Sequence, residues 1–172
     1  MKQPQKKYIY IDIGSLNNKA IQTYNFILGA EAPSRAKQIT KFNDILVSTV
    51  RPNLNNVAMV KSNYEDILSS TGFCVLRTNK TSFSSYYLFE VVKHKGFVQS
   101  LVNVAKGASY PAVSNNDILD LKISMPPIEL QNKFASIVQK IEQIKEQETK
   151  KLQHLETLHN SLMDKAFKGE IK

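Results

Sequence analysis

Short runs of alternating or continuous apolar residues dominate the first part of the chain. Residues 8–13 (YIYIDI) alternate strictly and place Ile9, Ile11 and Ile13 on one face, a pattern typical of a strand with one buried side. Residues 44–50, 57–60 and 73–77 are short apolar runs rich in β-branched residues, and residues 121–125 alternate again. The pattern therefore predicts strands over residues 8–13, 44–50, 57–60, 73–77 and 121–125.

Helical spacing replaces alternation after residue 83. Residues 84–94 and 96–105 carry apolar side chains three and four positions apart, which predicts two short helices broken near Gly96. Ser114 is followed three residues later by Asp117, a loose capping box that predicts a helical turn. Strands and helices mix without a regular βαβ alternation, so we expect an α+β domain with a central β-sheet rather than a doubly wound sheet.

The last quarter of the chain has the pattern of one long helix. Pro127 suits a first helical position, Glu129 suits the first turn, and Gly169 suits a C-terminal stop. Apolar residues recur at steps of four and three, as in a heptad seam, weaken at the charged stretch 145–151 and then resume. The seam consists of Leu130, Phe134, Ile137, Ile141, Ile144, Leu152, Leu155, Leu158, Leu162 and Ala166.

A helix of about 40 residues is about 60 Å long, whereas a domain of about 120 residues has a radius of gyration of only about 14 Å. We therefore predict two regions, a globular domain over residues 1–125 and a helix over 126–172 that pairs in an antiparallel coiled coil. An exposed stripe of Leu and Ile needs such a partner. The alternative is a hairpin of two shorter helices that turns at 145–151, although no Gly or Pro marks a turn there.

Charge is distributed unevenly between these two regions. The net charge is +8. Residues 1–125 hold 15 Lys and Arg against 8 Asp and Glu, or +7, and the remainder holds 8 against 7, or +1. A basic excess confined to the globular part favours a polyanionic partner such as DNA. The alternative is an ordinary basic protein without a nucleic acid partner.

Composition limits the location and chemistry of the protein. No apolar run reaches the roughly 18 residues of a membrane span, and the N-terminus lacks the pattern of a signal peptide. The single cysteine, Cys74, excludes an intramolecular disulfide, so a cytoplasmic location without membrane association is expected. No glycine-rich phosphate loop and no histidine spacing suited to a metal occurs, so we expect no cofactor, no metal and no catalytic residues.

Three loops carry side chains suited to a DNA duplex. Arginine can pair with guanine and asparagine with adenine, while lysine, serine and backbone N–H groups suit phosphates. The candidate DNA-binding residues are Ser34, Arg35 and Lys37 in 31–38, Arg51 and Asn53 in 48–56, and Lys106, Ser109 and Tyr110 in 105–116. The alternatives are that these loops are ordinary turns, and that Arg51 anchors its loop on a core carbonyl.

The order and spacing of these loops and of the helix resemble those of a known protein family. EAPSRAKQ, DILVSTVRPNLNNVAMV, KGASYPAVSNNDILDLKISMPPIELQNKFASIV and LHNSLMDKAFKGEIK are similar to one repeat of the specificity subunit of type I restriction–modification systems, from Tyr8 onward. The family has two such repeats and usually an extra opening segment, often with a Trp. The single repeat here resembles a short half-subunit, a gene fragment or an artificially shortened chain.

The resemblance implies a division of roles. Each repeat has a target recognition domain that reads one half of a split DNA sequence, and a long helix that sets the spacing and docks the methyltransferase subunits, which the restriction subunit joins. It implies a non-catalytic subunit, and a half-length form would be a homodimer that reads an interrupted palindrome. Two alternatives are a truncated paralogue that pairs with full-length subunits without reading DNA, and an enzyme that binds S-adenosylmethionine.

Overall fold

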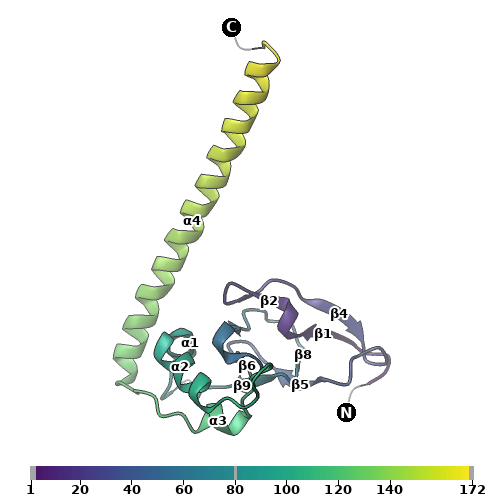
Figure 1. The fold of residues 1–172 in the computed structure, drawn as a ribbon, viewed down its shortest axis with the longest axis vertical. Coiled ribbons are helices and arrows are strands. Elements are labelled where there is room, and N and C mark those ends of the chain that lie inside the picture. Colours follow the sequence, from purple (N-terminus) through teal and green to yellow (C-terminus); the bar gives the residue numbers. More distant parts are fainter. Residues whose placement is uncertain (1–2, 80, 171–172) are drawn as a thin grey trace. The chain divides into compact units, whose positions relative to one another are not determined.

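The computed structural model describes residues 3–79 and 81–170. The chain divides into two compact units, Met1–Asn132 and Lys133–Lys172. The division falls inside the long helix α4 (Ile128–Phe167), so the first turn of that helix belongs to the first unit. The α+β fold with a long C-terminal helix (Figure 1) agrees with the expected fold class.

Two sheets form the strand layers of the first unit. The four-stranded sheet has the order β4-β1-β8-β5, in which β1 lies parallel to β8 and antiparallel to β4. The three-stranded sheet has the order β7-β6-β9 and is antiparallel throughout. A separate two-stranded hairpin, β2 (Leu16–Asn17) and β3 (Ala20–Ile21), turns at Asn18 and Lys19. The other strands are β1 (Lys7–Ile11), β4 (Asn25–Leu28), β5 (Ala36–Thr40), β6 (Ile45–Ser48), β7 (Val57–Met59), β8 (Ile67–Ser70) and β9 (Phe73–Leu76).

The three-stranded sheet is the middle layer of the first unit. Its strand β6 faces helices with Ile45 and Val47, and faces the four-stranded sheet with Leu46, which packs with Ile9 and Ile11 of β1. Figure 1 shows the helices on one side of β6 and β9 and the four-stranded sheet on the other. Burial on both faces explains why β6 is a continuous apolar run rather than an alternating one.

Three short helices cover the outer face of that middle sheet: α1 (Ser85–Lys93), α2 (Lys95–Val104) and α3 (Asn115–Leu119). The chain breaks between α1 and α2 at His94, whose side chain accepts a hydrogen bond from the Gly96 backbone. The predicted capping box is confirmed, because Ser114 and Asp117 satisfy each other's backbone N–H groups. Two single turns of 3-10 helix, η1 (Ile13–Ser15) and η2 (Pro52–Leu54), complete the unit.

The helix α4 is continuous through residues 145–151, so the hairpin alternative is wrong. It begins one residue after Pro127, whose carbonyl accepts hydrogen bonds from the backbones of Leu130 and Gln131. It ends at Phe167, and Gly169, the expected C-terminal stop, follows with a positive φ of 70°. The backbone bonds from Gly169 to Ala166 and from Glu170 to Lys165 form a Schellman motif, which satisfies carbonyls at the helix end.

Two parts of the prediction differ from the structure. Residues 121–125 are not a strand. The alternation there arises because Leu121 and Ile123 pack against the helical cluster while the segment lacks a ladder partner among the described residues. The sequence pattern does not predict strands β4, β5 and β8, since they are short and their sequences mix polar with apolar residues. It also does not predict β2 and β3, which have only two residues each. Among the described residues, no helix has the length and apolar character to span a bilayer.

Candidate DNA interface

Backbone hydrogen bonds connect the three candidate loops. The Arg35 carbonyl accepts from the Thr71 amide at 2.9 Å, and the Gly72 carbonyl accepts from both the amide and the hydroxyl of Thr49, at 2.9 and 3.0 Å. The Thr49 carbonyl accepts from the Val113 amide at 2.8 Å. The loops around residues 35, 50 and 110 are therefore linked through the turn between β8 and β9, although they are distant in sequence.

Arg51 has a backbone conformation that arginine seldom adopts. It lies in the left-handed region with φ 49° and ψ 62°, a conformation that costs a non-glycine residue about 1–2 kcal/mol. Its amide donates a hydrogen bond to the Pro111 carbonyl at 2.7 Å, which holds the loop on the neighbouring hairpin. Strained residues persist where the surrounding structure fixes them, and they cluster at functional sites.

The Arg51 side chain stacks on Tyr110. The guanidinium carbon lies 4.5 Å from the centre of the Tyr110 ring, a cation–π contact. Both side chains are exposed, and within residues 3–79 and 81–170 the guanidinium has neither a hydrogen-bond acceptor nor an acidic partner. It therefore does not sit on a core carbonyl, and its five donors face solvent.

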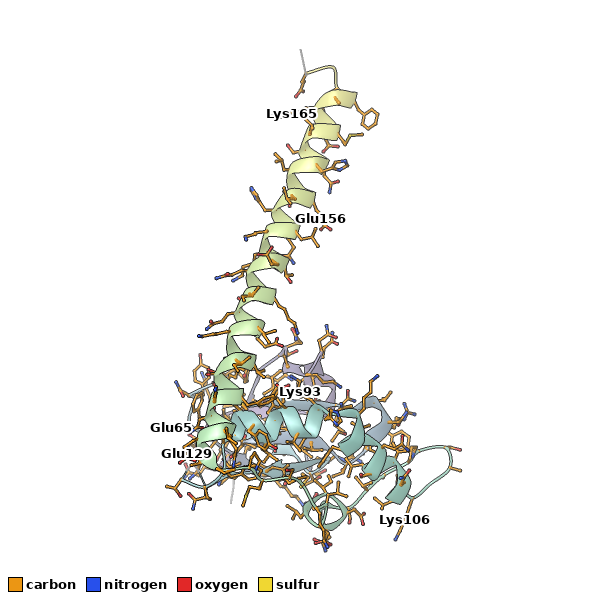
Figure 2. All side chains as sticks on the ribbon, turned by 90° about the vertical axis from the view of Figure 1, so that its left-hand side faces the viewer. Glu65, Lys93, Lys106, Glu129, Glu156 and Lys165 are labelled. Atoms are coloured by element: carbon orange, nitrogen blue, oxygen red, sulfur yellow. The ribbon has the colours of Figure 1, made fainter. Side chains whose placement is uncertain are left out.

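A hairpin carries the other candidates of the third loop. Lys106 and Ala112 exchange two backbone hydrogen bonds of 2.9 Å, and Val50 pairs with Ala112 across from them. The turn needs Gly107, which has φ 99°, because a Cβ atom there would lie 2.9 Å from the Tyr110 carbonyl oxygen. Lys106 and Ser109 are exposed on this hairpin, and Figure 2 shows Lys106 at the margin of the first unit.

The β2–β3 hairpin supports the loop that follows Arg51. The Lys19 amino group donates to the Asn55 carbonyl, while the Asn55 side chain donates to the Lys93 carbonyl at 3.0 Å. Burial lowers the pKa of Lys19, and the positive charge of Lys93 lowers it further. Asn53 lies exposed in the η2 turn between these supports. No sequence motif around Lys19 predicts that it holds the loop after Arg51 in place.

The first loop lies against the edge strand β5. Ser34 and Arg35 are exposed in the turn that precedes this strand. Lys37 is exposed at a register shift of β5 and lines a hollow of about 390 Å³ with Lys6, Tyr8 and Asp66. The structure thus places the stacked pair of Arg51 and Tyr110 on two linked loops and connects Arg35 to them through backbone, whereas Lys37 faces a separate hollow.

The predicted pairing residues form a row along α4. All of them are exposed, with exposed fractions between 42% and 60%, and Figure 2 shows side chains projecting from the helix along its length. The row comprises Leu130, Phe134, Ile137, Ile141, Ile144, Leu152, Leu155, Leu158 and Leu162. These apolar side chains are therefore not covered by the described residues of the chain.

Asp44 and Cys74 are titratable side chains that lie buried in the first unit. Asp44 is buried and receives a two-pronged contact from Arg77, with Nε and Nη2 at 2.8 and 2.6 Å. This contact with Asp44 raises the pKa of Arg77. Burial raises the pKa of the Cys74 thiol to about 11, which keeps it protonated. In the part of the chain that the structure describes, no three His, Cys, Asp or Glu side chains gather as metal ligands would.

The sequence model of a protein family, the type I restriction modification DNA specificity domain, matches residues 2–157, which is most of the chain. The chain belongs to this family. The specificity subunit of the type I restriction enzyme HindI from Haemophilus influenzae is 23% identical over 161 residues, which cover 92% of this chain and 35% of that protein. The chain therefore spans about a third of the length of that curated relative.

Solved structures of this family share the fold. The HsdS subunit from Thermoanaerobacter tengcongensis is similar with a TM-score of 0.74 and 33% identity, over 83% of this chain and 38% of that one. A chain from a study of complex assembly and conformational transition of the type I R-M system is similar with a TM-score of 0.75 and 32% identity, with the same coverage. The resemblance found in the sequence is thereby confirmed.

Proposed function

We propose that this chain is a DNA-reading specificity module of a type I restriction–modification system. Its first unit reads one half of a bipartite target, and its long helix docks the methyltransferase subunits, which the restriction subunit joins. It supplies recognition and no catalysis. Two copies pair through α4, so that their combined target is an interrupted palindrome.

The exposed stack of Arg51 on Tyr110 is the observation that carries this proposal. An arginine held in a strained backbone conformation, fixed by the Pro111 carbonyl and stacked on an aromatic ring, presents donors whose direction is already set. A guanidinium presented in this way can contact guanine O6 and N7 together. The +7 charge of residues 1–125 supplies the phosphate attraction that positions such a contact.

Selection from a pool of random duplexes tests the reading of DNA. The wild-type protein should enrich one sequence. The logarithm of its association constant for that duplex should fall linearly with the logarithm of the salt concentration. Lys106→Ala should weaken binding to enriched and random duplexes alike, with a salt slope smaller by about 1. Lys165→Ala removes the same charge from the last turn of α4 and serves as the matched control.

The other outcome would favour the truncated paralogue. Retention only at low salt, with no enriched sequence, would mean that the chain assembles without reading DNA. Docking is tested separately by size-exclusion chromatography of the protein mixed with a purified type I methyltransferase subunit. Co-elution of the wild type, lost on substitution of the exposed α4 residue Ile141 by Asp, supports the docking role of the helix, and independent elution contradicts it.

A further inference from the structure

The seven-residue repeat of α4 continues through its charged centre. If Phe134 and Ile137 are taken as the first two seam positions, steps of four and three lead to Glu148 and Lys151 and then back to leucines. The nine seam positions are Phe134, Ile137, Ile141, Ile144, Glu148, Lys151, Leu155, Leu158 and Leu162. Between Phe134 and Leu162 the charged residues of the repeat are thus the adjacent two at the middle, and the next position is Lys165.

The seam has the same spacing when followed outward from its centre in either direction. Steps of four, three and four lead backward from Glu148 to Ile144, Ile141 and Ile137. The same steps lead forward from Lys151 to Leu155, Leu158 and Leu162. A second copy turned end over end about a two-fold axis at the centre therefore meets the first copy layer by layer, as a self-complementary interface requires.

We propose that α4 pairs with a second copy of itself, antiparallel, about a two-fold axis beside residues 149–150. This inference rests on the self-pairing in the proposed function and adds the register. Glu148 of each copy then faces Lys151 of the other. Outward from the axis, the layers join Ile144 to Leu155, Ile141 to Leu158 and Ile137 to Leu162, each twice by symmetry.

The charges at the centre select this orientation. Within one chain the Lys151 amino group already lies 2.7 Å from the Glu148 carboxylate, and both side chains are more than half exposed. In the antiparallel pair, the two ion pairs meet as four charges of alternating sign. A parallel pair in register would oppose Glu148 to Glu148 and Lys151 to Lys151, and such facing like charges act against a wrong arrangement.

A competing antiparallel register lies three residues away. It opposes Ile144 to Leu152, Ile141 to Leu155 and Phe134 to Leu162. It also puts Glu148 against its own copy and His159 against Ile137 in the apolar seam. Both contacts bury polar groups without a complementary partner, which costs free energy. The register proposed here avoids both contacts. Its layers out to Ile137 and Leu162 are isoleucine on leucine, and its last layer joins Phe134 to Lys165, whose apolar stem can cover the ring.

Paired cysteines distinguish the two registers without DNA. The variant Ile144→Cys/Leu155→Cys should form a dimer with two disulfides between the chains under mild oxidation, and peptide mapping should join residue 144 to residue 155. Ile144→Cys/Leu152→Cys is the matched control and should crosslink far less. The native Cys74 is 2% exposed and remains outside the reaction while the protein is folded. Preferential crosslinking of 144 to 152, or a monomer at every concentration in sedimentation equilibrium, would overturn the proposal.

Charge exchange at the axis tests the contact itself. Glu148→Lys and Lys151→Glu should each raise the dimer Kd at least about tenfold, because each places four like charges together. An equal mixture of the two variants should recover dimers that contain one of each chain. Glu156→Lys, an exposed change beside the seam (Figure 2), should leave the Kd unchanged.

Unaltered Kd values in the two axis variants, or no mixed dimer, would contradict the proposed facing of Glu148 and Lys151. Because pairing is measured without DNA, a protein that selects no DNA sequence but crosslinks as expected refutes only the reading of DNA. A protein that selects sequence but fails to crosslink refutes only the register.

Discussion

The side-chain oxygen of Gln131 accepts a hydrogen bond from the backbone nitrogen of Ser84 at 2.9 Å. The amide nitrogen of the same side chain donates to the carbonyls of Pro126 and Ser82, at 2.7 and 3.4 Å. Ser84 is the N-cap of α1 and makes no side-chain cap of its own, so Gln131 satisfies an amide that a helix start leaves unpaired. One glutamine thus joins the first turn of α4 to the start of α1.

Gln131→Ala should lower the free energy of unfolding of the first unit by about 1–3 kcal/mol, because Gln131 is only 1% exposed and its loss leaves the partly buried Ser84 amide without an acceptor. Urea denaturation followed by circular dichroism measures the change. Asn132→Ala, at the exposed next position, should have little effect. Equal midpoints for the Gln131 variant and the wild type would show that the contact contributes nothing.

Arg77→Ala should destabilise the protein by about 2–3 kcal/mol, because it leaves the Asp44 carboxylate with fewer donors in the core. Asp44 is 1% exposed, and besides Arg77 it accepts from the Lys41 amide at 2.7 Å. Arg77→Lys should destabilise the protein, but less than Arg77→Ala does, because lysine keeps the positive charge and cannot make the two-pronged contact with Asp44. Thermal melting of the three proteins gives the order, and an alanine variant as stable as the lysine variant would refute the explanation.

Much of the fold follows from local signals in the sequence. The alternation of residues 8–13 predicted the burial of Ile9 and Ile11, which are 2% and 0% exposed. Ser114 with Asp117 and the glycine at 169 predicted a helix start and a helix end, because caps depend on a few neighbouring residues. The helical spacing of α1, α2 and α4 needed no tertiary information.

Features that depend on tertiary partners could not be predicted. Strand β8 has the sequence ILSS, which is half polar, yet both serines are buried because β1 and β5 flank the strand. Tyr8 and Tyr10 are also buried, in a small cluster with Ala36 and Leu68, whereas the alternation predicted burial of the isoleucine face alone. The stack of Arg51 on Tyr110 joins loops about 60 positions apart, and no spacing rule links them.

The Cys74 thiol should react with a soluble disulfide reagent only when the protein unfolds. The side chain is 2% exposed, and burial raises its pKa from 9.0 to about 11. The folded pKa lies above the unfolded one, so this contribution to stability is complete below about pH 9 and is lost as pH rises towards 11. Labelling at pH 8 should follow urea unfolding, and wild-type stability should fall relative to Cys74→Ala between pH 9 and 11. Rapid labelling of the native protein would contradict this environment.

Arg51 should separate stability from DNA reading. Arg51→Ala and Arg51→Gly both remove the guanidinium and should weaken binding to a selected duplex equally, by about 1–3 kcal/mol. Their stabilities should differ: glycine adopts the left-handed conformation without strain, so Arg51→Gly should be more stable than Arg51→Ala by about 1 kcal/mol. Tyr110→Phe keeps the stacking ring and should retain sequence preference, whereas Tyr110→Ala should relax it at one base position. Unchanged preference in Arg51→Ala, with only a lower melting temperature, would make Arg51 a structural residue of its loop.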